Sequence, residues 1–333
     1  MDHIPTINDM FLASEVRGLG RDDRRYRREV ASGMLVRIHR GAFVPKSEWD
    51  FWTPHMRYQM RCIGAATSGR TRPVLSHDSA AAIHQIPVLG AYPKLVHVLA
   101  TIAAGTRTEH GFRKHATALM DVDIESRGEL RITNLVRTLV EFASTTSFAS
   151  AVAALDWALR PEARNQDPRT TRESILDCAK RLNLSRGRVR LLHALDFANP
   201  LSESPGESFS RAIIHELGFP APELQKEFFD SRGLIGRVDF WWPAHNLVGE
   251  FDGIAKYVRE EYARGMTVAQ IVVAEKVRED RIRATGPGFA RWEWDYPANP
   301  QRLYHLLSEA GLPSWRRGAY RHQLPRQNRA SSA

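Results

Sequence analysis

Three acidic residues in and beside two short apolar segments are the side chains best suited to chemistry. Asp239 lies in the segment Val238–Trp242, and Glu250 and Asp252 lie in and just beyond the segment Leu247–Phe251. Turn-forming residues separate the two segments, which predicts a hairpin of two strands. Because side chains two apart on a strand share a face, Glu250 and Asp252 are expected to lie together. Asp239 joins them if it faces the same way.

Carboxylates gathered in this way need a cation. Two like charges about 4 Å apart repel by roughly 4 kcal/mol at an effective dielectric constant of ~20. One carboxyl group would therefore keep its proton unless a cation were bound. Oxygen donors without thiolates favour Mg²⁺ or Mn²⁺ over zinc. The alternative is an exposed hairpin whose acids point into water, but apolar residues surround the acids on both strands.

The stretch RVDF, a short loop and then LVGEFDG resembles the PD-(D/E)xK nuclease superfamily, in the branch related to very short patch repair endonucleases. The resemblance covers residues 201–304 and implies a restriction-endonuclease-like α/β domain that hydrolyses DNA phosphodiester bonds with Mg²⁺. By position it implies that Asp239 and Glu250 are catalytic metal ligands. Glu207, in the preceding helix, matches the helix acid of the superfamily, and Glu207 or Asp252 would assist in holding the metal.

The resemblance breaks at one position. Where the superfamily has a lysine two residues after the second strand acid, this chain has Asp252, and the nearest lysine is Lys256. The resemblance therefore gives Lys256 the catalytic role of orienting the attacking water or stabilising the charge of the transition state. Glu207 also has a structural interpretation, because the helix dipole stabilises a carboxylate near a helix N-terminus. Pro205 is expected to begin that helix.

Three further features lie downstream of the hairpin. Residues 259–267 are charged and contain glycine, which predicts a mobile loop near the site. Arg278 is expected on the following helix, where it contacts either a phosphate or an acidic residue of a neighbouring turn. Trp292 and Trp294 alternate as in a strand, which predicts that both face the core.

The chain has 333 residues, of which 43% are hydrophobic and 26% charged, as in an ordinary globular protein of two or three domains. Its net charge of +9 favours a polyanionic partner. The excess of basic residues is concentrated in residues 17–46 and 313–333. The second of these segments is rich in Arg and Ser, which predicts a disordered basic tail.

Several classes of protein are disfavoured. No apolar run approaches the ~20 residues of a membrane span, and the N-terminus does not resemble a signal peptide. We therefore expect a cytoplasmic protein without a membrane partner. Cys62 and Cys178 lie in different segments, so neither a disulfide framework nor a zinc site is predicted.

Residues 5–45 predict a small helical unit closed by a hairpin. A first helical part is followed by a basic helix that stops at Gly33, and LVRIHRGAFV then alternates as two strands that turn at Arg40. This is the order of a winged helix-turn-helix. On the basic helix Tyr26 and Val30 lie four apart and are expected to face the core. The apolar anchors of the first helical part are Met10, Leu12 and Val16.

The arginines of this unit are candidates for contacts with DNA phosphates and base edges. They are Arg24, Arg25, Arg27 and Arg28 on the basic helix and Arg37 and Arg40 on the hairpin. The alternative is a solvated basic helix without a ligand. The segment GMLVRIHRGAF resembles the wing of the N-terminal winged helix of AbiEi-type antitoxins, and this resemblance favours DNA binding.

Residues 51–200 carry the least information about function. VLSHDSAAAIH and RTLVEFA resemble the middle part of AbiEi-like proteins of actinobacterial type, a resemblance that implies no chemistry. Ser76 and Thr133 are expected to cap helices, and KLVHVLA is expected to form a strand. His77 and His84 lie seven apart on one helix face. Because no third ligand is near, we expect them to pack or hydrogen-bond rather than bind a metal.

Together these patterns predict an α/β protein, α+β overall. The predicted regions are a winged helix-turn-helix (residues 1–50), a mixed α/β middle region (51–200), a restriction-endonuclease-like α/β domain (201–312) and a basic tail (313–333). The predicted function is a Mg²⁺-dependent endodeoxyribonuclease with DNA as partner, and the resemblance implies phage defence or a mobile element as its context. The alternative is a non-catalytic, antitoxin-like transcriptional regulator with an inactive nuclease-like domain. The sequence leaves open a nuclease acting on RNA or single strands, a homodimer, and a protein partner such as a cognate toxin.

Overall fold

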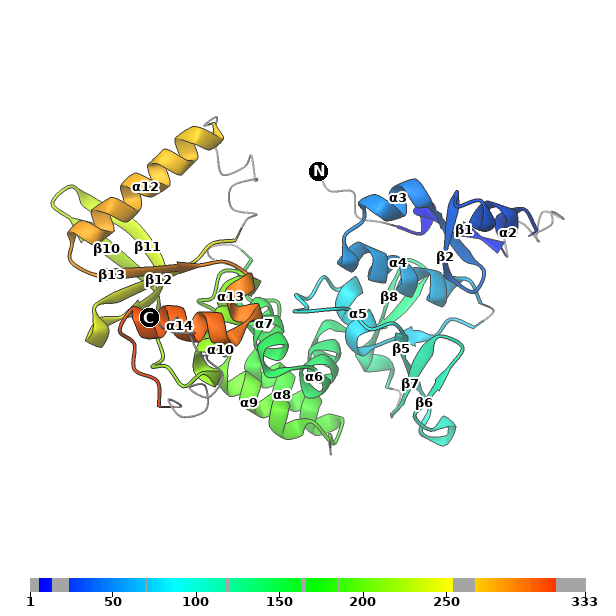
Figure 1. Cartoon of the computed structure of the whole chain (residues 1–333). Helices are drawn as coiled ribbons and strands as arrows, with labels where there is room; N and C mark the ends of the chain where they lie inside the picture. Colours follow the sequence, from blue (N-terminus) through cyan, green and yellow to red (C-terminus); the bar gives the residue numbers. More distant parts are fainter. Residues whose placement is uncertain are drawn as a thin grey trace, which may run out of the picture. The chain divides into compact units, whose positions relative to one another are not determined.

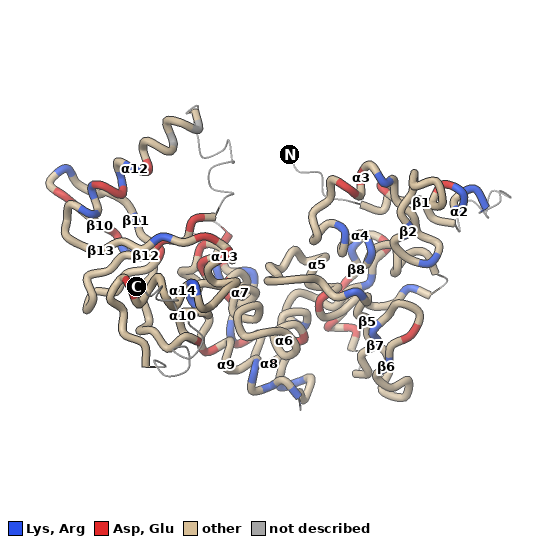
Figure 2. Tube along the Cα trace, viewed as in Figure 1, with Lys and Arg blue, Asp and Glu red and all other residues tan. Residues whose placement is uncertain are grey.

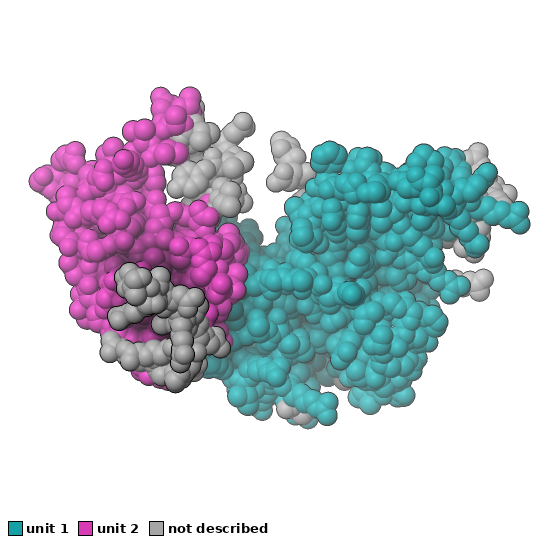
Figure 3. Space-filling model, viewed as in Figure 1, with its two compact units in different colours: residues 1–198 teal, residues 199–333 magenta. Residues whose placement is uncertain are grey.

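The computed structural model describes residues 6–13, 24–69, 71–117, 120–162, 166–184, 186–253 and 267–315. The chain divides into two compact units, residues 1–198 and 199–333 (Figure 3). Helices occur together with three sheets, so the expectation of an α+β protein is confirmed. Among the described residues, no helix combines the length and the apolar composition needed to cross a membrane.

The first unit begins with a three-stranded sheet and one basic helix (Figure 1). Its elements are η1 (Ile7–Asp9), β1 (Phe11–Leu12), α2 (Arg24–Ala31), β2 (Leu35–His39) and β3 (Ala42–Pro45), with strand order β1-β3-β2. The basic helix and the hairpin form as expected. Tyr26 and Val30 pack against a buried cluster that includes Phe43. Gly33, just beyond the helix, has a left-handed φ of +76°, which suits the end of a helix.

The first predicted helical part is wrong for Met10 and Leu12. The chain forms η1 and then the short strand β1, in which Leu12 pairs with Ala42 in an antiparallel ladder. Met10 and Leu12 are buried in the core of the unit. Pairing with β3 therefore prevails over the helical spacing of the apolar residues, because it also buries them. Val16 lies outside the described residues.

A six-stranded mixed sheet follows, with strand order β6-β7-β5-β4-β9-β8. The elements of this part are α3 (Lys46–Phe51), α4 (Pro54–Thr67), β4 (Val74–Leu75), α5 (His77–Ile83), β5 (Val96–Ala100), η2 (Ile102–Ala104), β6 (Arg107–Glu109), β7 (Phe112–Ala116), η3 (Asp121–Asp123), β8 (Ile124–Arg127) and β9 (Leu130–Thr133). Ser76 precedes α5 as expected, although its side chain makes no capping bond. One buried cluster runs from Met10 to Ile132, so residues on both sides of position 50 share a core.

Helices complete the described part of the first unit: α6 (Leu135–Thr145), α7 (Phe148–Leu159), α8 (Arg172–Arg181) and α9 (Arg188–Phe197). The expected cap of α6 is wrong by one residue. The side chain of Asn134 accepts a hydrogen bond of 2.9 Å from the Arg137 N–H. Thr133 instead pairs with Ile124 at the end of β9. Both residue types cap helices well, so strand pairing decides which of the two does so.

The second unit is built on a four-stranded sheet with strand order β10-β11-β12-β13 (Figure 1). Its elements are α10 (Pro205–Glu216), β10 (Glu223–Asp230), β11 (Gly233–Trp242), η4 (Pro243–His245), β12 (Leu247–Phe251), α12 (Val268–Ala284), β13 (Gly288–Trp292), α13 (Asp295–Ala298) and α14 (Pro300–Glu309). Neighbouring strands from β10 to β12 are antiparallel, whereas β12 and β13 are parallel. The predicted hairpin is confirmed as β11 and β12.

Helices α12 and α10 cover opposite faces of this sheet. Ile282 of α12 packs in a buried cluster with Val248 of β12. On the other face, Ser210 of α10 accepts a hydrogen bond of 2.8 Å from Nε1 of Trp292. The alternation of side chains along β12 then directs Val248 and Glu250 to the α12 face and Phe251 to the α10 face.

Close packing between α10 and β12 fixes the strand that carries Glu250. A Cβ atom at Gly206 would lie 2.0 Å from Cε1 of Phe251, so only glycine permits this approach. Phe251 is almost fully buried. Because Phe251 follows Glu250 directly, its anchoring also restricts the position of the Glu250 backbone.

The strand predicted through Trp292 and Trp294 is wrong at its end. Trp292 is buried and ends β13, whereas Trp294 is 40% exposed and precedes α13. The carbonyl of Trp292 accepts a hydrogen bond of 2.8 Å from the Asp252 N–H. The ladder with β12 thus reaches its last bond at Trp292, and the chain turns into a helix rather than continuing the strand.

Candidate functional site

Asp239 and Glu250 lie on neighbouring strands of the second unit. The ladder pairs Phe240 with Gly249, and its continuation by one residue places Asp239 opposite Glu250. Oδ2 of Asp239 accepts a hydrogen bond of 2.9 Å from the Phe251 N–H. Asp239 is 9% exposed and Glu250 is 5% exposed, so both acids are buried. The structure therefore brings together the two strand acids that the sequence singled out.

Two arginines hold the carboxylate of Glu250. Nη2 of Arg278, from α12, lies 2.6 Å from Oε1, and Nη2 of Arg291, from β13, lies 2.7 Å from Oε2. Nε of Arg291 also lies 3.2 Å from Oδ2 of Asp252. Glu250 and Asp252 thus share one partner, as expected for two residues on one face of a strand. Arg278 also pairs with Glu275, one turn away on the same helix, so the ion pair that was one of its two expected roles is confirmed.

Carboxylates of α12 extend this network. Oε1 of Glu275 lies 2.7 Å from Nη2 of Arg278 and 2.9 Å from Nη2 of Arg291. Oε2 of Glu279 lies 3.4 Å from Nη2 of Arg291. Together with Glu250 and Asp252, these contacts place four carboxylates around Arg278 and Arg291, and Arg283 adds a third guanidinium group at Glu279 in the described part of the network. Its formal charge is negative.

Opposing effects act on the charge of Glu250. Burial raises the pKa of Glu250, repulsion from Asp239 raises it further, and Arg278 and Arg291 act in the opposite direction. The two strand acids are therefore close enough to repel each other. Their donor set consists of carboxylate oxygens, which suits Mg²⁺ or Mn²⁺. Mg²⁺ is commonly held by one or two carboxylates together with substrate phosphates, and Asp239 with Glu250 fits that pattern.

The metal roles of the other predicted residues stay predictions. Among the described residues, no group of three or more His, Cys, Asp or Glu side chains is placed to hold a metal ion. Lys256 and residues 259–266 of the predicted loop lie outside the described residues, so their roles stay predictions. The metal role of Asp252 also stays a prediction, because its described contact is with Arg291.

Glu207 is buried at the start of α10 and caps the helix. Its Oε1 accepts a hydrogen bond of 2.8 Å from the Ser204 hydroxyl, and its Oε2 accepts one of 2.8 Å from the Glu203 N–H. Ser204 Oγ in turn accepts the N–H of Glu207 at 3.2 Å. This reciprocal pattern resembles a capping box, except that Glu207 accepts the backbone N–H of Glu203 and not that of the N-cap residue Ser204. The structural interpretation of Glu207 is therefore confirmed, and its role as a metal ligand stays a prediction.

Sequence reasoning missed Gln225 and Arg291. Nε2 of Gln225 donates a 3.1 Å hydrogen bond to Oε2 of Glu207. Gln225 lies within β10 yet has a left-handed φ of +54°, which costs on the order of 1–3 kcal/mol for a residue other than glycine. Nothing in the sequence marks this position. Arg291 is placed beside Glu250 by the parallel pairing of β13 with β12, and the sequence alone does not reveal that pairing.

The arginines predicted to contact DNA are exposed on α2 and on the β2–β3 hairpin. They are Arg24, Arg25, Arg27, Arg28, Arg37 and Arg40. Figure 2 shows the run of basic residues along α2. Nε of Arg25 lies 2.6 Å from Oε1 of Glu29, but Arg25 is largely exposed. An exposed ion pair of this kind contributes little, so it does not restrict Arg25 to Glu29.

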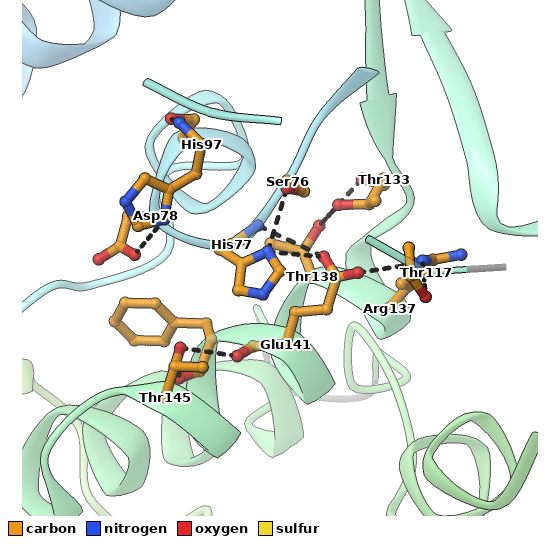
Figure 4. A network of polar contacts seen from close by, with 12 residues as sticks. Ser76, His77, Asp78, His97, Thr117, Thr133, Arg137, Thr138, Glu141 and Thr145 are labelled. Carbon is orange, nitrogen blue, oxygen red and sulfur yellow. Dashed lines mark hydrogen bonds and ion pairs between the residues drawn. The ribbon is translucent and has the colours of Figure 1, made fainter. Parts of the chain in front are cut away.

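A second polar cluster lies where β4 meets α5 in the first unit (Figure 4). His77 follows the strand and has a left-handed φ of +49°. Its Nδ1 lies 3.0 Å from Oγ of Ser76 and 3.5 Å from Oε2 of Glu141. The rings of His77 and His115 stack with centroids 3.7 Å apart. These contacts hold His77 in a conformation that costs on the order of 1–3 kcal/mol.

His97 of β5 completes this cluster. Its Nδ1 lies 3.2 Å from Oδ2 of Asp78, and its ring centroid lies 5.0 Å from that of His115. Burial lowers the pKa of both His77 and His115 to about 3, so both imidazoles are neutral near pH 7. A cavity of about 420 Å³ adjoins the cluster. Its lining residues are His77, Asp78, Pro93, Leu95, His97, Arg113, His115, Thr145 and Thr146.

His84 does not belong to this cluster. Its Nε2 lies 2.8 Å from the carbonyl oxygen of Thr133, and its Nδ1 lies 3.0 Å from Nη2 of Arg127. His84 lines a different cavity from His77. The expectation that His84 makes hydrogen bonds is confirmed.

A buried arginine lies next to the histidine cluster (Figure 4). Nε of Arg137 is 2.8 Å from Oε1 of Glu141, and its Nη1 is 3.3 Å from Oδ2 of Asp123. The side chains of Arg137 and Asp123 are fully buried. Asp123 also accepts a 2.6 Å hydrogen bond from Arg181. Burial raises the pKa of Glu141, and the charge of Arg137 opposes this effect.

Comparison with known proteins gives relatives without a described function. No protein-family model matches the chain. It is similar to two uncharacterized proteins of Mycobacterium tuberculosis, one from strain CDC 1551 / Oshkosh and one from strain ATCC 25618 / H37Rv. Each is 33% identical over 154 residues, a match that covers 43% of this chain and 55% of the relative. The chain thus spans about half the length of the curated relatives it matches.

Proposed function

We propose that the second unit is a metal-dependent endodeoxyribonuclease. The observation that carries this proposal is the placement of two buried acids, Asp239 and Glu250, on adjacent strands of one sheet. The order of elements supports it. Helix α10 bears Glu207, β11 and β12 bear the strand acids, and α12 and β13 close the unit. This is the order that the resemblance to PD-(D/E)xK nucleases implies.

The residues present suit a hard divalent cation. Mg²⁺ or Mn²⁺ bound to Asp239 and Glu250 would lower the pKa of a bound water and offset the charge on the scissile phosphate. Asp252 and Glu207 are the further carboxylates of this proposal. Lys256 is proposed to orient the attacking water or to stabilise the charge that develops in the transition state.

DNA is the proposed substrate, and we place the protein in the cytoplasm. The exposed arginines of α2 and the β2–β3 hairpin support a winged helix that binds phosphates. Because each neutralised phosphate releases counterions, DNA affinity should fall steeply as the salt concentration rises. Phage defence or a mobile element is the biological context that we propose.

Plasmid cleavage tests the nuclease. Purified protein is incubated with supercoiled plasmid in Mg²⁺, Mn²⁺ or EDTA, and nicked product is quantified. Asp239→Asn and Glu250→Gln should each reduce metal-dependent nicking by roughly 10²–10³-fold or more, because each removes a charge that the transition state needs. Glu227→Gln, a change of an exposed acid on the same sheet, should leave nicking unchanged. Nicking that survives both site substitutions would place the activity elsewhere.

The alternative function is a DNA-binding regulator with an inactive nuclease-like unit. One observation favours it: both oxygens of Glu250 are engaged by Arg278 and Arg291, which leaves the carboxylate stabilised without a metal. A regulator would show salt-sensitive DNA binding without cleavage in any metal.

Substitution of two helix arginines tests DNA binding by α2. Arg24→Gln combined with Arg25→Gln should weaken binding of a duplex about tenfold or more and should reduce the dependence of affinity on salt. Fluorescence anisotropy at several salt concentrations measures both. Arg107→Gln, on the exposed strand β6 of the same unit, is the matched control. Equal affinity of the double variant and the control would exclude α2 from the DNA interface.

A further inference from the structure

The two cations at Glu250 are the side chains of Arg278 and Arg291. They approach different oxygens, at 2.6 and 2.7 Å, so each oxygen of the carboxylate has a guanidinium partner. Arg278 is anchored further by a 3.1 Å hydrogen bond to the carbonyl oxygen of Arg237. It passes over β11 at Gly236, where a Cβ atom would lie 3.2 Å from its Cδ. Glycine at position 236 thus leaves room for the Arg278 side chain to reach Glu250, the carboxylate that is proposed to bind the metal.

A metal ion and these guanidinium groups would compete for Glu250. Charges of like sign close to one carboxylate repel each other, and the repulsion is strong where water is excluded. With Arg278 and Arg291 in place, each oxygen of Glu250 already has a cationic partner. One carboxylate rarely holds Mg²⁺ without further oxygen ligands. In the free protein, metal affinity at this site should therefore be low.

A DNA phosphate changes this balance. Guanidinium groups bind phosphate oxygens in the same paired geometry in which they bind carboxylates. A phosphate beside Glu250 would offer Arg278 and Arg291 a second anion, and it would also offer a metal ion the oxygen ligands that the protein does not supply. The two arginines have other acidic neighbours too, since Glu275 contacts both.

We propose that Arg278 and Arg291 block the metal site at Glu250 until a DNA phosphate draws them away, so that metal and DNA bind cooperatively. This inference rests on the proposed nuclease function. It assigns the two arginines a double role: counter-ions of Glu250 in the free protein and phosphate ligands in the complex. Because coupling between two ligands is reciprocal, DNA should raise metal affinity by the same factor by which metal raises DNA affinity.

Metal titration without turnover tests the proposal. Binding of Mn²⁺ to the full chain is followed by the electron paramagnetic resonance signal of free Mn²⁺, alone and with a duplex that carries phosphorothioate linkages. In the wild type, the duplex should tighten Mn²⁺ binding at least tenfold. Arg278→Gln and Arg291→Gln should each bind Mn²⁺ at least tenfold more tightly than the wild type without DNA, and the effect of the duplex should shrink.

Matched variants separate this role from a structural one. Arg283→Gln, on the same helix but paired only with Glu279 among the described carboxylates, should behave as the wild type. Arg291→Lys keeps the charge, so Mn²⁺ affinity without DNA should stay low even if Arg291→Gln is unstable. In EDTA, Arg278→Gln and Arg291→Gln should bind the duplex more weakly, whereas a loss of structure would lower affinity for both ligands together.

The outcomes distinguish this inference from the proposed function. Mn²⁺ affinity that is the same in the wild type and both glutamine variants, with or without DNA, would overturn the blocking role and leave the nuclease standing. Failure of every form to bind Mn²⁺, even with the duplex, would overturn the metal-dependent nuclease itself. Loss of Mn²⁺ binding in Asp239→Asn would place the bound ion at the strand acids, as the inference requires.

Discussion

Replacement of Arg137 by methionine is expected to lower the free energy of unfolding of the first unit by about 3–5 kcal/mol. Arg137 is fully buried and lies between the carboxylates of Asp123 and Glu141. Methionine fills a similar volume but carries no charge, so two buried carboxylates would lose their shared cation. Urea denaturation gives the change in free energy, and hydrogen exchange of α6 amides assigns it to the first unit.

Arg181 provides the matched control for this prediction. It contacts the same carboxylate, with Nη2 2.6 Å from Oδ1 of Asp123, but it is 41% exposed. Arg181→Gln should therefore cost about 1 kcal/mol or less. Adding Asp123→Asn and Glu141→Gln to Arg137→Met should recover part of the lost stability, because the uncompensated charges are then gone. Equal costs for Arg137→Met and Arg181→Gln would show that burial does not set the strength of this network.

Acidification from pH 7 to 5 is expected to destabilise the first unit through its histidine cluster. The pKa of His77 is lowered from its ordinary value of 6.5 to about 3, mainly by burial and also by repulsion from His97. Between these two pKa values, the unfolded chain therefore binds a proton at His77 that the folded chain does not bind. The contribution of neutral His77 to the free energy of unfolding is fully present above pH ~6.5. It falls as the pH drops from there toward ~3, by up to roughly 1.4 kcal/mol per pH unit for one histidine.

Asparagine at position 77 isolates this effect. Asparagine tolerates a left-handed φ, so His77→Asn removes the imidazole and keeps the backbone conformation. Between pH 7 and 5 the variant should lose roughly 2 kcal/mol less stability than the wild type. His110→Asn is the control, because His110 has a φ of +50° but is exposed. Urea denaturation at half-unit steps of pH makes the comparison. Parallel curves for His77→Asn and the wild type would contradict the prediction.

Local sequence signals predicted most of the elements that carry these sites. The alternation of apolar residues and the turn after Trp242 located β11 and β12, and Pro205 marked the start of α10. The basic helix and its hairpin were found in the same way. Errors arose where two local signals competed and tertiary pairing decided, as at Leu12, which joins a strand rather than a helix, and at Asn134, which caps α6 in place of Thr133.

The candidate site was predictable only in part. Spacing and face alternation were enough to bring Asp239 to Glu250, since both lie on one hairpin. The partners of Glu250 were not predictable from spacing, because Arg278 and Arg291 come from a helix and a strand that reach it only through the fold. The same holds for the stacking of His77 on His115, which depends on the positions of β4 and β7 in a six-stranded sheet.

The wide separation along the chain between Glu250 and its cationic partners has a consequence for biosynthesis. Arg278 and Arg291 lie 28 and 41 residues after Glu250, so the β11–β12 hairpin is synthesised before either arginine. Contacts between residues far apart in sequence form slowly, and the parallel strand β13 can join only after α12. Until then Glu250 stays ionised and hydrated, as an exposed carboxyl group is near neutral pH, and the final closure of the sheet exchanges its water for the two guanidinium groups.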